Sequence, residues 1–502
     1  MTNNDFNIGK PKLHKFEPLK VDYMNKFINE AKLKSNFTPP PSLTLSPKDT
    51  TRSKSSFKKY LVEYASASTV HGLNHLIAPR RHIFEKLLVA FFIIGSLVIL
   101  IILSIDFWDR YQNYPTVIVL DHEYRSFNVT KPGIVVCPNQ RVHEEYYPSV
   151  FEKYGVKDTE EARSFFNFLS TASYETFSQV PDFNEVDPKL WLFILFDLKP
   201  DVKYVFEEEK AVWLVTERGV CLTFNNYVAP YSTPDYWKAN NWTVIPVPDL
   251  PVYTYQTREI FDSIKIITHD VEFSPIYPGS ILNLDDKFYL SYRKTLKSVT
   301  LSVAEITSSQ QVKDLSLTQR KCKLFEEGGL KMWPIYTYTM CASECRYQQV
   351  YKICKCYPYF ARPMPDIPVC NVSQLKCIGE HLNEIVLPRE VIIKKCNCWP
   401  DCDMAKYMEE SISGIALKEG SPPEALLNIV TSFPTDKFKR ELLFGFNDFL
   451  ASVGGGAGLF LGASVISFIE ILYFATLRLF WYKVKLYQEN KKKRKVASAI
   501  VN

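Results

Sequence analysis

The sequence predicts a membrane protein in which two transmembrane helices flank a large, disulfide-rich α+β ectodomain. Two long apolar stretches lie at Leu87–Ile105 and Phe449–Trp481, and a single bilayer crossing needs roughly 20 apolar residues. All twelve cysteines lie between these stretches, from Cys137 to Cys402. An even number of cysteines confined to one segment indicates disulfides in an oxidising compartment.

The N-terminal part of the chain is predicted to be cytosolic. Residues 1–60 are polar and Lys-rich, which is typical of a disordered tail. Residues 61–86 form a pre-membrane segment that carries His71-Gly72. A His-Gly pair is weak evidence alone, since a glycine that caps a helix C-terminus is the ordinary alternative. The first transmembrane helix is expected at 87–106, with an aromatic belt just after it.

Basic residues on the flanks of the two spans predict the orientation. Arg80, Arg81 and Lys86 precede the first span, and Arg478 and the run 491–495 follow the second. Because positively charged flanks stay on the cytoplasmic side, both termini should be cytosolic and residues 107–448 extracellular. We therefore expect a multi-pass protein of the plasma membrane. The basic tail, 482–502, is close enough to the membrane to touch anionic lipid.

The extracellular segment alternates strand-like runs with one helical region. The helical region is 142–177, where aromatic residues recur at helix-face spacing. Runs rich in β-branched residues predict strands at Thr116–Leu120, Gly133–Val136, Ala211–Phe224, Ile260–Thr268 and Thr295–Ile306. Sequons at Asn128, Asn241 and Asn371 predict N-glycosylation here, and a fourth at Asn36 should stay unused in the cytosol.

A dense cysteine array closes the extracellular segment. Ten cysteines lie within 322–402, and the gaps between them are nearly palindromic, with CxxxC and CxC followed later by CxC and CxxxC. This order suits nested pairing, although spacing alone fixes no connectivity. Zinc binding is the alternative for such pairs. Outside the cell, with no paired histidines nearby, disulfides are favoured and no metal site is expected.

The second apolar stretch, 449–481, has the composition of a pore-lining helix. Five glycines, Gly454, Gly455, Gly456, Gly458 and Gly462, predict that the helix tilts or breaks. Glu470 is an acidic side chain at membrane depth, where it needs water or a protein partner. A packed membrane anchor with small-residue contacts remains the alternative on this stretch alone.

These features resemble the degenerin/epithelial sodium channel/acid-sensing ion channel superfamily, and within it the pickpocket branch. The resemblance extends from His71 to about Trp481. It is carried by His71-Gly72, GVCLTFN around Cys221, QRKC ending at Cys322, the array ending in CNCWPDC, and GLFLGAS at Gly458–Ser464. It implies a hand-like ectodomain of palm, finger and thumb, with 322–402 thumb-like, and a trimeric channel.

The resemblance also implies the function and its site residues. It implies a sodium-preferring, amiloride-sensitive, voltage-independent channel subunit that opens to an unidentified extracellular ligand or to mechanical force. Gly462, Ala463 and Ser464 would form the narrow selectivity belt, with Glu470 below it. His71 and Gly72 would influence gating, Ala451 would match a position where a bulky side chain holds the channel open, and Gly458 would match the blocker site.

The family's disulfide pattern is likewise only implied by the resemblance. It pairs Cys137–Cys221, Cys322–Cys402, Cys341–Cys398, Cys345–Cys396, Cys354–Cys377 and Cys356–Cys370. One departure concerns Leu317–Lys321, where some relatives have a Trp that meets an aromatic residue above the first span. This chain has none there, so any coupling between thumb and membrane must use other contacts.

Other functions fit the sequence less well. A two-pass receptor or adhesion protein that does not conduct would have no functional need for Gly462, Ala463, Ser464 or Glu470. An auxiliary subunit that needs a heteromeric partner is a further alternative. ATP-gated channels share two spans but differ in cysteine spacing. We find no nucleophile elbow, phosphate loop or metal motif, so we expect no enzyme, no catalytic residue and no nucleic-acid partner. No cofactor is expected beyond the permeant sodium ion, and the partners are related subunits in a homo- or heterotrimer.

Overall fold

The fold is described from a computed structural model of the chain. The structure describes residues 56–121, 128–205, 211–238, 242–247, 252–253, 259–266, 270–418, 425–432 and 437–500. They fall into two compact units, one ending at Ala67 and one beginning at Ser68. The sequon Asn241, the unused sequon Asn36 and most of the expected tail lie outside the described residues.

The first unit contains helix α2, Ser56–Ala67. Residues 56–60 were expected to belong to a disordered tail, and here the sequence prediction is wrong. Tyr60 and Tyr64 are four residues apart and therefore share one face of a helix. Helix α2 therefore begins inside the segment whose composition predicts disorder.

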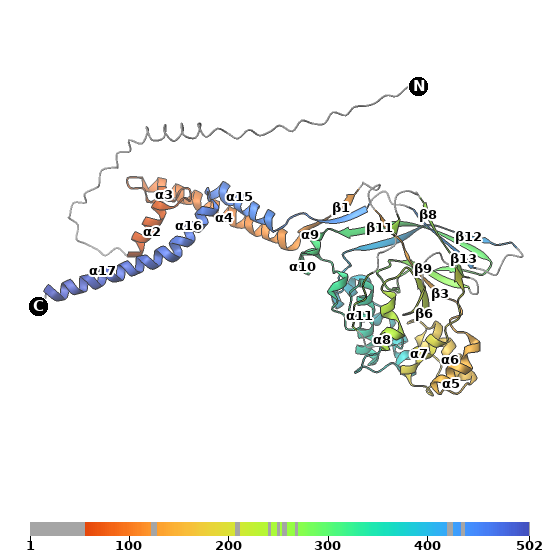
Figure 1. The fold of residues 1–502 in the computed structure, drawn as a ribbon. Helices are drawn as coiled ribbons and strands as arrows, with labels where there is room; N and C mark the ends of the chain where they lie inside the picture. Colours follow the sequence, from red (N-terminus) through yellow and green to blue (C-terminus); the bar gives the residue numbers. More distant parts are fainter. Residues whose placement is uncertain are drawn as a thin grey trace, which may run out of the picture. The chain divides into compact units, whose positions relative to one another are not determined.

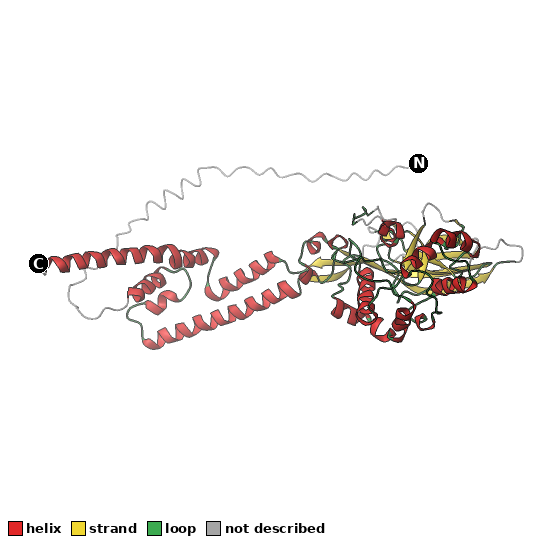
Figure 2. Ribbon diagram, turned by 90° about the horizontal axis from the view of Figure 1, so that it is seen from below, coloured by secondary structure: helices red, strands yellow, loops and turns green. Residues whose placement is uncertain are grey.

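Two long helices of the second unit lie side by side (Figures 1 and 2). The short helix α3, Leu73–Ile77, precedes α4, Ile83–Asn113, and α4 packs against α15, Phe446–Leu461. Helix α4 extends beyond its apolar stretch at both ends. The chain then continues as α16, Val465–Tyr473, a π-helical turn at Phe474–Arg478, and α17, Leu479–Ile500.

Helices long and apolar enough to cross a membrane occur twice within the described residues, at Ile83–Asn113 and Val465–Gln488. The second of these combines α16, the π-helical turn and the start of α17. Helix α15 is counted apart from it because three residues interrupt the helix between Leu461 and Val465. The expected span 449–481 is thus two helices joined by a short non-helical link.

The extracellular strands form two main sheets in the described part of the chain. The larger has seven strands in the order β1-β14-β11-β13-β8-β4, with β12 paired to β11. Its strands are β1 Thr116–Asp121, β4 Tyr204–Val205, β8 Glu259–Ile266, β11 Thr295–Ser308, β12 Met404–Ala416, β13 Ala425–Ser432 and β14 Lys437–Leu442. Strand β1 follows α4 and β14 precedes α15, so this sheet joins directly to both membrane helices.

The smaller sheet is antiparallel and has the order β10-β9-β3-β6-β5 within the described residues. Its strands are β3 Gly133–Pro138, β5 Val212–Thr216, β6 Gly219–Phe224, β9 Val271–Ile276 and β10 Tyr289–Ser291. A separate pair joins β2 Val129–Thr130 to β7 Val252–Tyr253. Buried residues of both sheets, such as Phe273 and Leu427, form one shared core.

Ten α-helices lie in the region between the two membrane segments within the described residues. In chain order they are α5 Tyr147–Tyr154, α6 Glu160–Thr171, α7 Pro188–Asp197, α8 Pro234–Lys238, α9 Gln310–Lys313, α10 Leu317–Arg320, α11 Tyr338–Cys354, α12 Val372–Glu380, α13 Leu382–Ile385 and α14 Arg389–Cys396. Figure 1 shows α5, α6 and α7 beyond one end of the smaller sheet, whereas α9 contacts β14 and α10 contacts α4. The aromatic cluster expected in 142–177 is buried packing, with Phe165 and Phe166 inaccessible to solvent.

All twelve cysteines are joined in six disulfides. The pairs are Cys137–Cys221, Cys322–Cys402, Cys341–Cys398, Cys345–Cys396, Cys354–Cys377 and Cys356–Cys370. Five of them join the region 322–356, which contains α11, to the region 370–402, which precedes β12. These five pairs are nested one inside the next, as the spacing of the cysteines suggests. This pairing leaves no thiol for the zinc alternative.

Candidate pore and pre-membrane segment

The interruption of the second span lies at Gly462, Ala463 and Ser464. Gly462 has φ +58°, a left-handed conformation that ends α15. The Gly462 N–H donates to Gly458 O at 3.0 Å, and the Ala463 N–H donates to Ala457 O at 3.2 Å. These bonds give partners to two carbonyls of the last turns of α15, so the end of the helix is capped by its own chain.

The other glycines do not break the helix. Gly454, Gly455, Gly456 and Gly458 all lie within α15, so the expected break occurs only at Gly462. A Cβ on Gly456 would lie 3.1 Å from Leu100 Cδ1 of α4. This small residue thus allows close packing of two membrane helices, as small residues do in bilayers.

The pre-membrane segment docks on the interruption. The His71 N–H donates to Leu461 O at 3.0 Å, and a Cβ on Gly462 would lie only 1.9 Å from His71 Nδ1. Gly72 has φ +91° and lies directly before α3, where a Cβ would approach Ile93 of α4. Gly72 is therefore the N-cap residue of α3, and the alternative that it caps the C-terminus of a helix is wrong.

Glu470 is held by the same segment. The Thr69 N–H donates to Glu470 Oε2 at 3.2 Å, and Thr69 Oγ1 lies 2.8 Å from both Glu470 Oε2 and Ser467 Oγ. The Thr69 hydroxyl can donate its one proton to either of these oxygens, so it lies between Glu470 and Ser467 and contacts both. The Ser464 N–H donates to Ser467 Oγ at 3.1 Å, which connects these polar groups to the interruption.

Most residues singled out for the pore thus come together, and Ala451 does not join this cluster through a described contact. A Cβ on Gly458 would lie 3.9 Å from the Ala463 carbonyl, so Gly458 borders the interruption. Ala451 is exposed on the first part of α15, three turns before Leu461. Its position is outside the cluster formed by His71 and Gly462.

Sequence reasoning missed Thr69 and Ser467. Thr69 lies two residues before His71, in a stretch of Ser, Thr and Ala that has no motif of its own. Ser467 lies three residues after Ser464, at the spacing of a helix-capping pair. That spacing was a usable signal for the start of α16, whereas only the fold brings Thr69 to it.

Aromatic residues join the membrane helices to the ectodomain. In the expected belt, Phe107 stacks on Phe444, and Trp108 and Tyr111 pack against Phe449 at centroid distances of 5.4 and 5.9 Å. Such contacts connect the end of α4 to the start of α15. The belt is therefore also an interhelical contact.

This chain has no Trp in Leu317–Lys321, and two polar residues of that stretch contact the C-terminal end of α4 instead. Gln319 Nε2 donates to Tyr111 O at 3.3 Å, and Lys321 Nζ lies 4.6 Å from the centre of the Tyr114 ring. Both come from α10 or the residue after it, next to Cys322. In the absence of a Trp, these two contacts connect the residues next to Cys322 to the end of α4.

The described sequons are accessible. Asn128 is exposed before β2, and Asn371 is exposed at the N-terminus of α12. Asn371 Oδ1 accepts hydrogen bonds from the Gln374 N–H and the Ser373 hydroxyl, so this sequon also caps the helix. Glycosylation at either asparagine remains a proposal.

Comparison with known proteins identifies the family. The sequence model of the amiloride-sensitive sodium channel family matches residues 64–474. Pickpocket protein 28 of Drosophila melanogaster is 21% identical over 517 residues, covering 88% of this chain and 82% of that protein. Acid-sensing ion channel 1 of Gallus gallus is 22% identical, covering 82% of each chain.

Other matches are partial. Pickpocket protein 11 of Drosophila melanogaster is 26% identical over 184 residues, and this match spans 34% of our chain and 35% of that protein. A solved structure, of a proton-activated chloride channel, aligns over 79% of this chain and 99% of that one at a TM-score of 0.25 and 7% identity, too low to bear on function. Because the family model covers most of the sequence, including the first membrane segment, the whole disulfide array and the interruption at Gly462–Ser464, this chain belongs to the amiloride-sensitive sodium channel family, alongside the pickpocket proteins and acid-sensing ion channels.

Proposed function

We propose that this cation-channel subunit is sodium-preferring, amiloride-sensitive and voltage-independent, and assembles as a homo- or heterotrimer with related subunits. It acts in the plasma membrane with both termini cytosolic. An extracellular ligand or a mechanical stimulus opens it. The observation that supports this best is the interruption at Gly462–Ser464, which exposes backbone within a membrane helix and carries a docked pre-membrane segment.

The interruption suits a selectivity belt for physical reasons. Non-helical backbone at membrane depth is tolerated where it is buried in protein or lines a water-filled cavity. Carbonyl groups there can replace part of an ion's hydration shell. In a trimer, three copies of Gly462, Ala463 and Ser464 around one axis would bring such carbonyls together. Three Glu470 side chains below them would favour cations over anions.

The docked segment gives gating a mechanical basis. His71 binds the last carbonyl of α15, and Thr69 binds Glu470 of α16, so one segment contacts both sides of the interruption. A movement of His71-Gly72 would therefore change the geometry of the belt directly. Ala451 serves as the position where bulk holds the pore open, and Gly458, which borders Ala463, belongs to the blocker site.

The test is the whole-cell current of Ala451→Val beside the parent protein, with and without amiloride. The substitution removes the need to know the stimulus. We expect a constitutive sodium current that amiloride blocks, and a change in ion selectivity when Gly462→Ala is added. Gly454→Ala is the matched control, because nothing lies within 4 Å of a Cβ at Gly454.

The absence of current has two readings that a second experiment separates. Surface labelling first establishes that the protein reaches the plasma membrane. Co-expression with a related subunit then restores current if the chain is an obligate member of a heterotrimer. Continued silence with both subunits at the surface would contradict the channel proposal and favour a two-pass receptor.

A further inference from the structure

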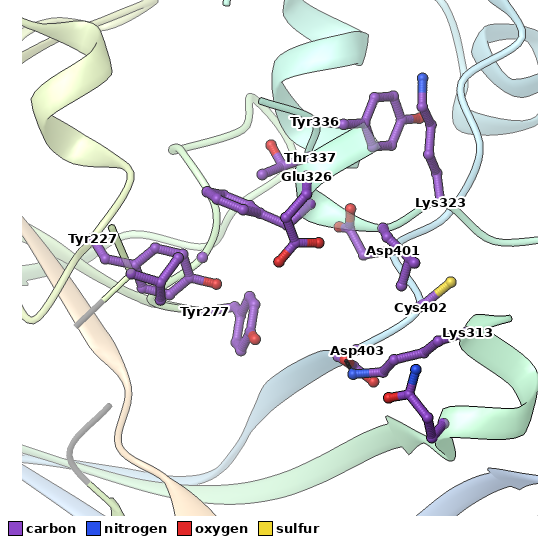
Figure 3. A pocket seen from close by; sticks show the side chains of 15 residues that line it. Tyr227, Tyr277, Lys313, Lys323, Glu326, Tyr336, Thr337, Asp401, Cys402 and Asp403 are labelled. Carbon is purple, nitrogen blue, oxygen red and sulfur yellow. Dashed lines mark ion pairs between the residues drawn. The ribbon is translucent and has the colours of Figure 1, made fainter. Parts of the chain in front are cut away.

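A cavity of about 410 Å³ lies at the base of the thumb-like region, far along the chain from the membrane segments (Figure 3). Its walls come from the ends of β9 and β11, from the segment after Cys322, and from the segment between Cys398 and β12. The residues that matter here are Tyr227, Tyr277, Lys313, Lys323, Tyr336 and Asp401. Ligand pockets for small molecules typically enclose ~300–1,000 Å³, so the cavity has the size of a binding site.

The floor of the cavity is rigid. The Cys322–Cys402 disulfide crosses it, the Lys323 N–H donates to Pro400 O at 2.9 Å, and the Cys402 N–H donates to Lys323 O at 3.1 Å. The two segments are thus fixed to each other on both sides of the disulfide. A site built on such a floor loses little conformational entropy when it is filled.

The positive charges at the cavity are already engaged. Lys313 Nζ lies 2.7 Å from Asp403 Oδ2, and the Ser308 N–H also donates to Asp403. Lys323 Nζ lies 4.2 Å from the centre of the Tyr336 ring, and Figure 3 shows its ammonium group directed away from Asp401. Neither lysine therefore neutralises Asp401.

Asp401 is a carboxyl group of the cavity wall that neither cavity lysine contacts. Its Oδ1 accepts the Tyr338 N–H at 2.9 Å, and no ion pair joins Asp401 to a basic side chain in the described part of the chain. Burial raises the pKa of Asp401 to about 7, and the neighbouring Asp403 raises it further, whereas the Tyr338 N–H and Arg389 oppose the shift. A bound cation would stabilise the charged form of this carboxyl group.

Tyrosines supply the remaining recognition surface. Tyr227 and Tyr277 lie opposite Asp401 in Figure 3, and burial raises the pKa of Tyr227 to about 12, so its phenol stays neutral. A Cβ on Gly279 would lie 1.9 Å from Tyr227 Oη, so only glycine lets this ring occupy its place. Aromatic rings attract ammonium groups electrostatically and also bury apolar carbon.

We propose that this cavity binds a small organic ammonium ion with an apolar moiety, with Asp401 as its counter-ion and Tyr227 and Tyr277 against its apolar part. The space is much larger than a bare metal ion, and its aromatic walls offer carbon where a metal needs oxygen ligands. Glu326, which is exposed at the rim, attracts the cation from solvent. The site is independent of the pore and of what opens it.

The test is calorimetric binding of benzylammonium to the full-length protein in detergent, with benzyl alcohol as the neutral probe of similar shape. We expect saturable binding of the cation, no measurable binding of the alcohol, and an affinity for the cation that increases from pH 6 to pH 8. The affinity increases with pH because protonation of Asp401 competes with binding of the cation. The other charged groups that act on Asp401 are Asp403 and Arg389, and Lys323 and Glu326 line the same cavity.

Three variants make the test specific. Asp401→Asn keeps the acceptor for Tyr338 and should lower the affinity about tenfold or more and remove its pH dependence. Gly279→Ala should lower it through displacement of Tyr227 without any change of charge. Glu470→Gln is the control for cation binding in the membrane segments and should leave the affinity unchanged.

Several results would overturn the proposal. They are equal binding by the parent and Asp401→Asn, equal binding of benzylammonium and benzyl alcohol, loss of binding only in Glu470→Gln, and no binding by the parent protein. A melting temperature of Asp401→Asn that is no lower than that of the parent at pH 6 shows that its loss of binding is not loss of the fold. None of these outcomes depends on whether the protein conducts ions.

Discussion

The Thr69 hydroxyl lies 2.8 Å from the Glu470 carboxylate, although 401 residues separate the two in the chain. Because the Thr69 N–H binds the same oxygen, two donors of one residue hold this acidic side chain. The contact fixes the pre-membrane segment to the second membrane span. Any movement of one changes the environment of the other.

Removal of the Thr69 hydroxyl should uncouple the pre-membrane segment from Glu470. Hydrogen bonds to a charged group contribute roughly 1.5–3 kcal/mol, so Thr69→Val should shift the docked equilibrium by about tenfold or more, while Thr69→Ser should behave as the parent. We expect a double-mutant cycle with Glu470→Gln, measured as open probability in the Ala451→Val background, to show coupling above about 1 kcal/mol. Additive effects would mean that the contact has no role in gating.

The close approach of His71 to Gly462 makes a second cycle informative. Gly462→Ala introduces a Cβ 1.9 Å from His71 Nδ1 and places alanine at φ +58°, where an L-residue loses roughly 1–2 kcal/mol. We expect a loss of current of about tenfold or more in the Ala451→Val background. The loss should be smaller when His71→Ala is already present, since only the backbone strain then remains. An equal loss in both backgrounds would exclude the steric contact.

A buried ion pair joins α11 to the turn between β5 and β6. Arg346 bonds to Glu217 through both its Nε and a terminal nitrogen, Tyr174 donates to the same carboxylate at 2.9 Å, and all three are at most 5% exposed. Glu217→Gln leaves the buried guanidinium without an anion and should destabilise the ectodomain by about 3–5 kcal/mol. Thermal unfolding and the fraction at the cell surface measure this effect.

Matched variants separate the charge from its hydrogen bonds. Tyr174→Phe should be destabilising by only about 1 kcal/mol, because the ion pair remains. Asp158→Asn, which removes an exposed partner of Arg163, should leave stability nearly unchanged. Equal melting temperatures for Glu217→Gln and Asp158→Asn would refute the assigned importance of the buried pair.

The raised pKa of Asp401 predicts a pH dependence of stability. The folded pKa is about 7, and an unperturbed Asp has a pKa of about 3.9. Between these values the folded state binds more protons than the unfolded state, so this group makes stability fall as pH rises, by at most about 1.4 kcal/mol per pH unit. Asp401→Asn removes that slope. We expect its melting temperature to exceed that of the parent increasingly from pH 5 to pH 8, and parallel profiles would contradict the assignment.

Variants of the sequon at Asn371 distinguish the effect of a glycan from the effect of the helix cap that Asn371 also provides. Asn371→Asp and Ser373→Ala both destroy the sequon but keep an acceptor at position 371 for the Gln374 N–H, so both should lose the glycosidase-sensitive mobility shift and keep stability. Asn371→Gln should lose the shift and also about 1 kcal/mol of stability with the cap. A parent protein without any shift at this site would disprove its modification.

The sequence by itself determined the two transmembrane segments, the confinement of the cysteines to the region between them and the strand-rich character of that region. Those features depend on composition and on short-range periodicity, which any single segment carries. The predicted strand Thr295–Ile306 is β11 almost residue for residue, because alternating burial is a property of the segment itself. The break near Gly462 was also visible as a local excess of glycine.

The tertiary structure decided which of these segments meet. Thr69 has no unusual neighbours in the sequence, and its role arises only because the fold places the segment before α3 against Ser467 and Glu470 of α16. Asp401 lies in the short segment between Cys398 and Cys402. It forms no ion pair with the two lysines of the cavity, because in the folded chain Lys313 pairs with Asp403 and Lys323 lies over the Tyr336 ring. Contacts over hundreds of residues depend on packing, and packing is a property of the whole chain rather than of any stretch within it.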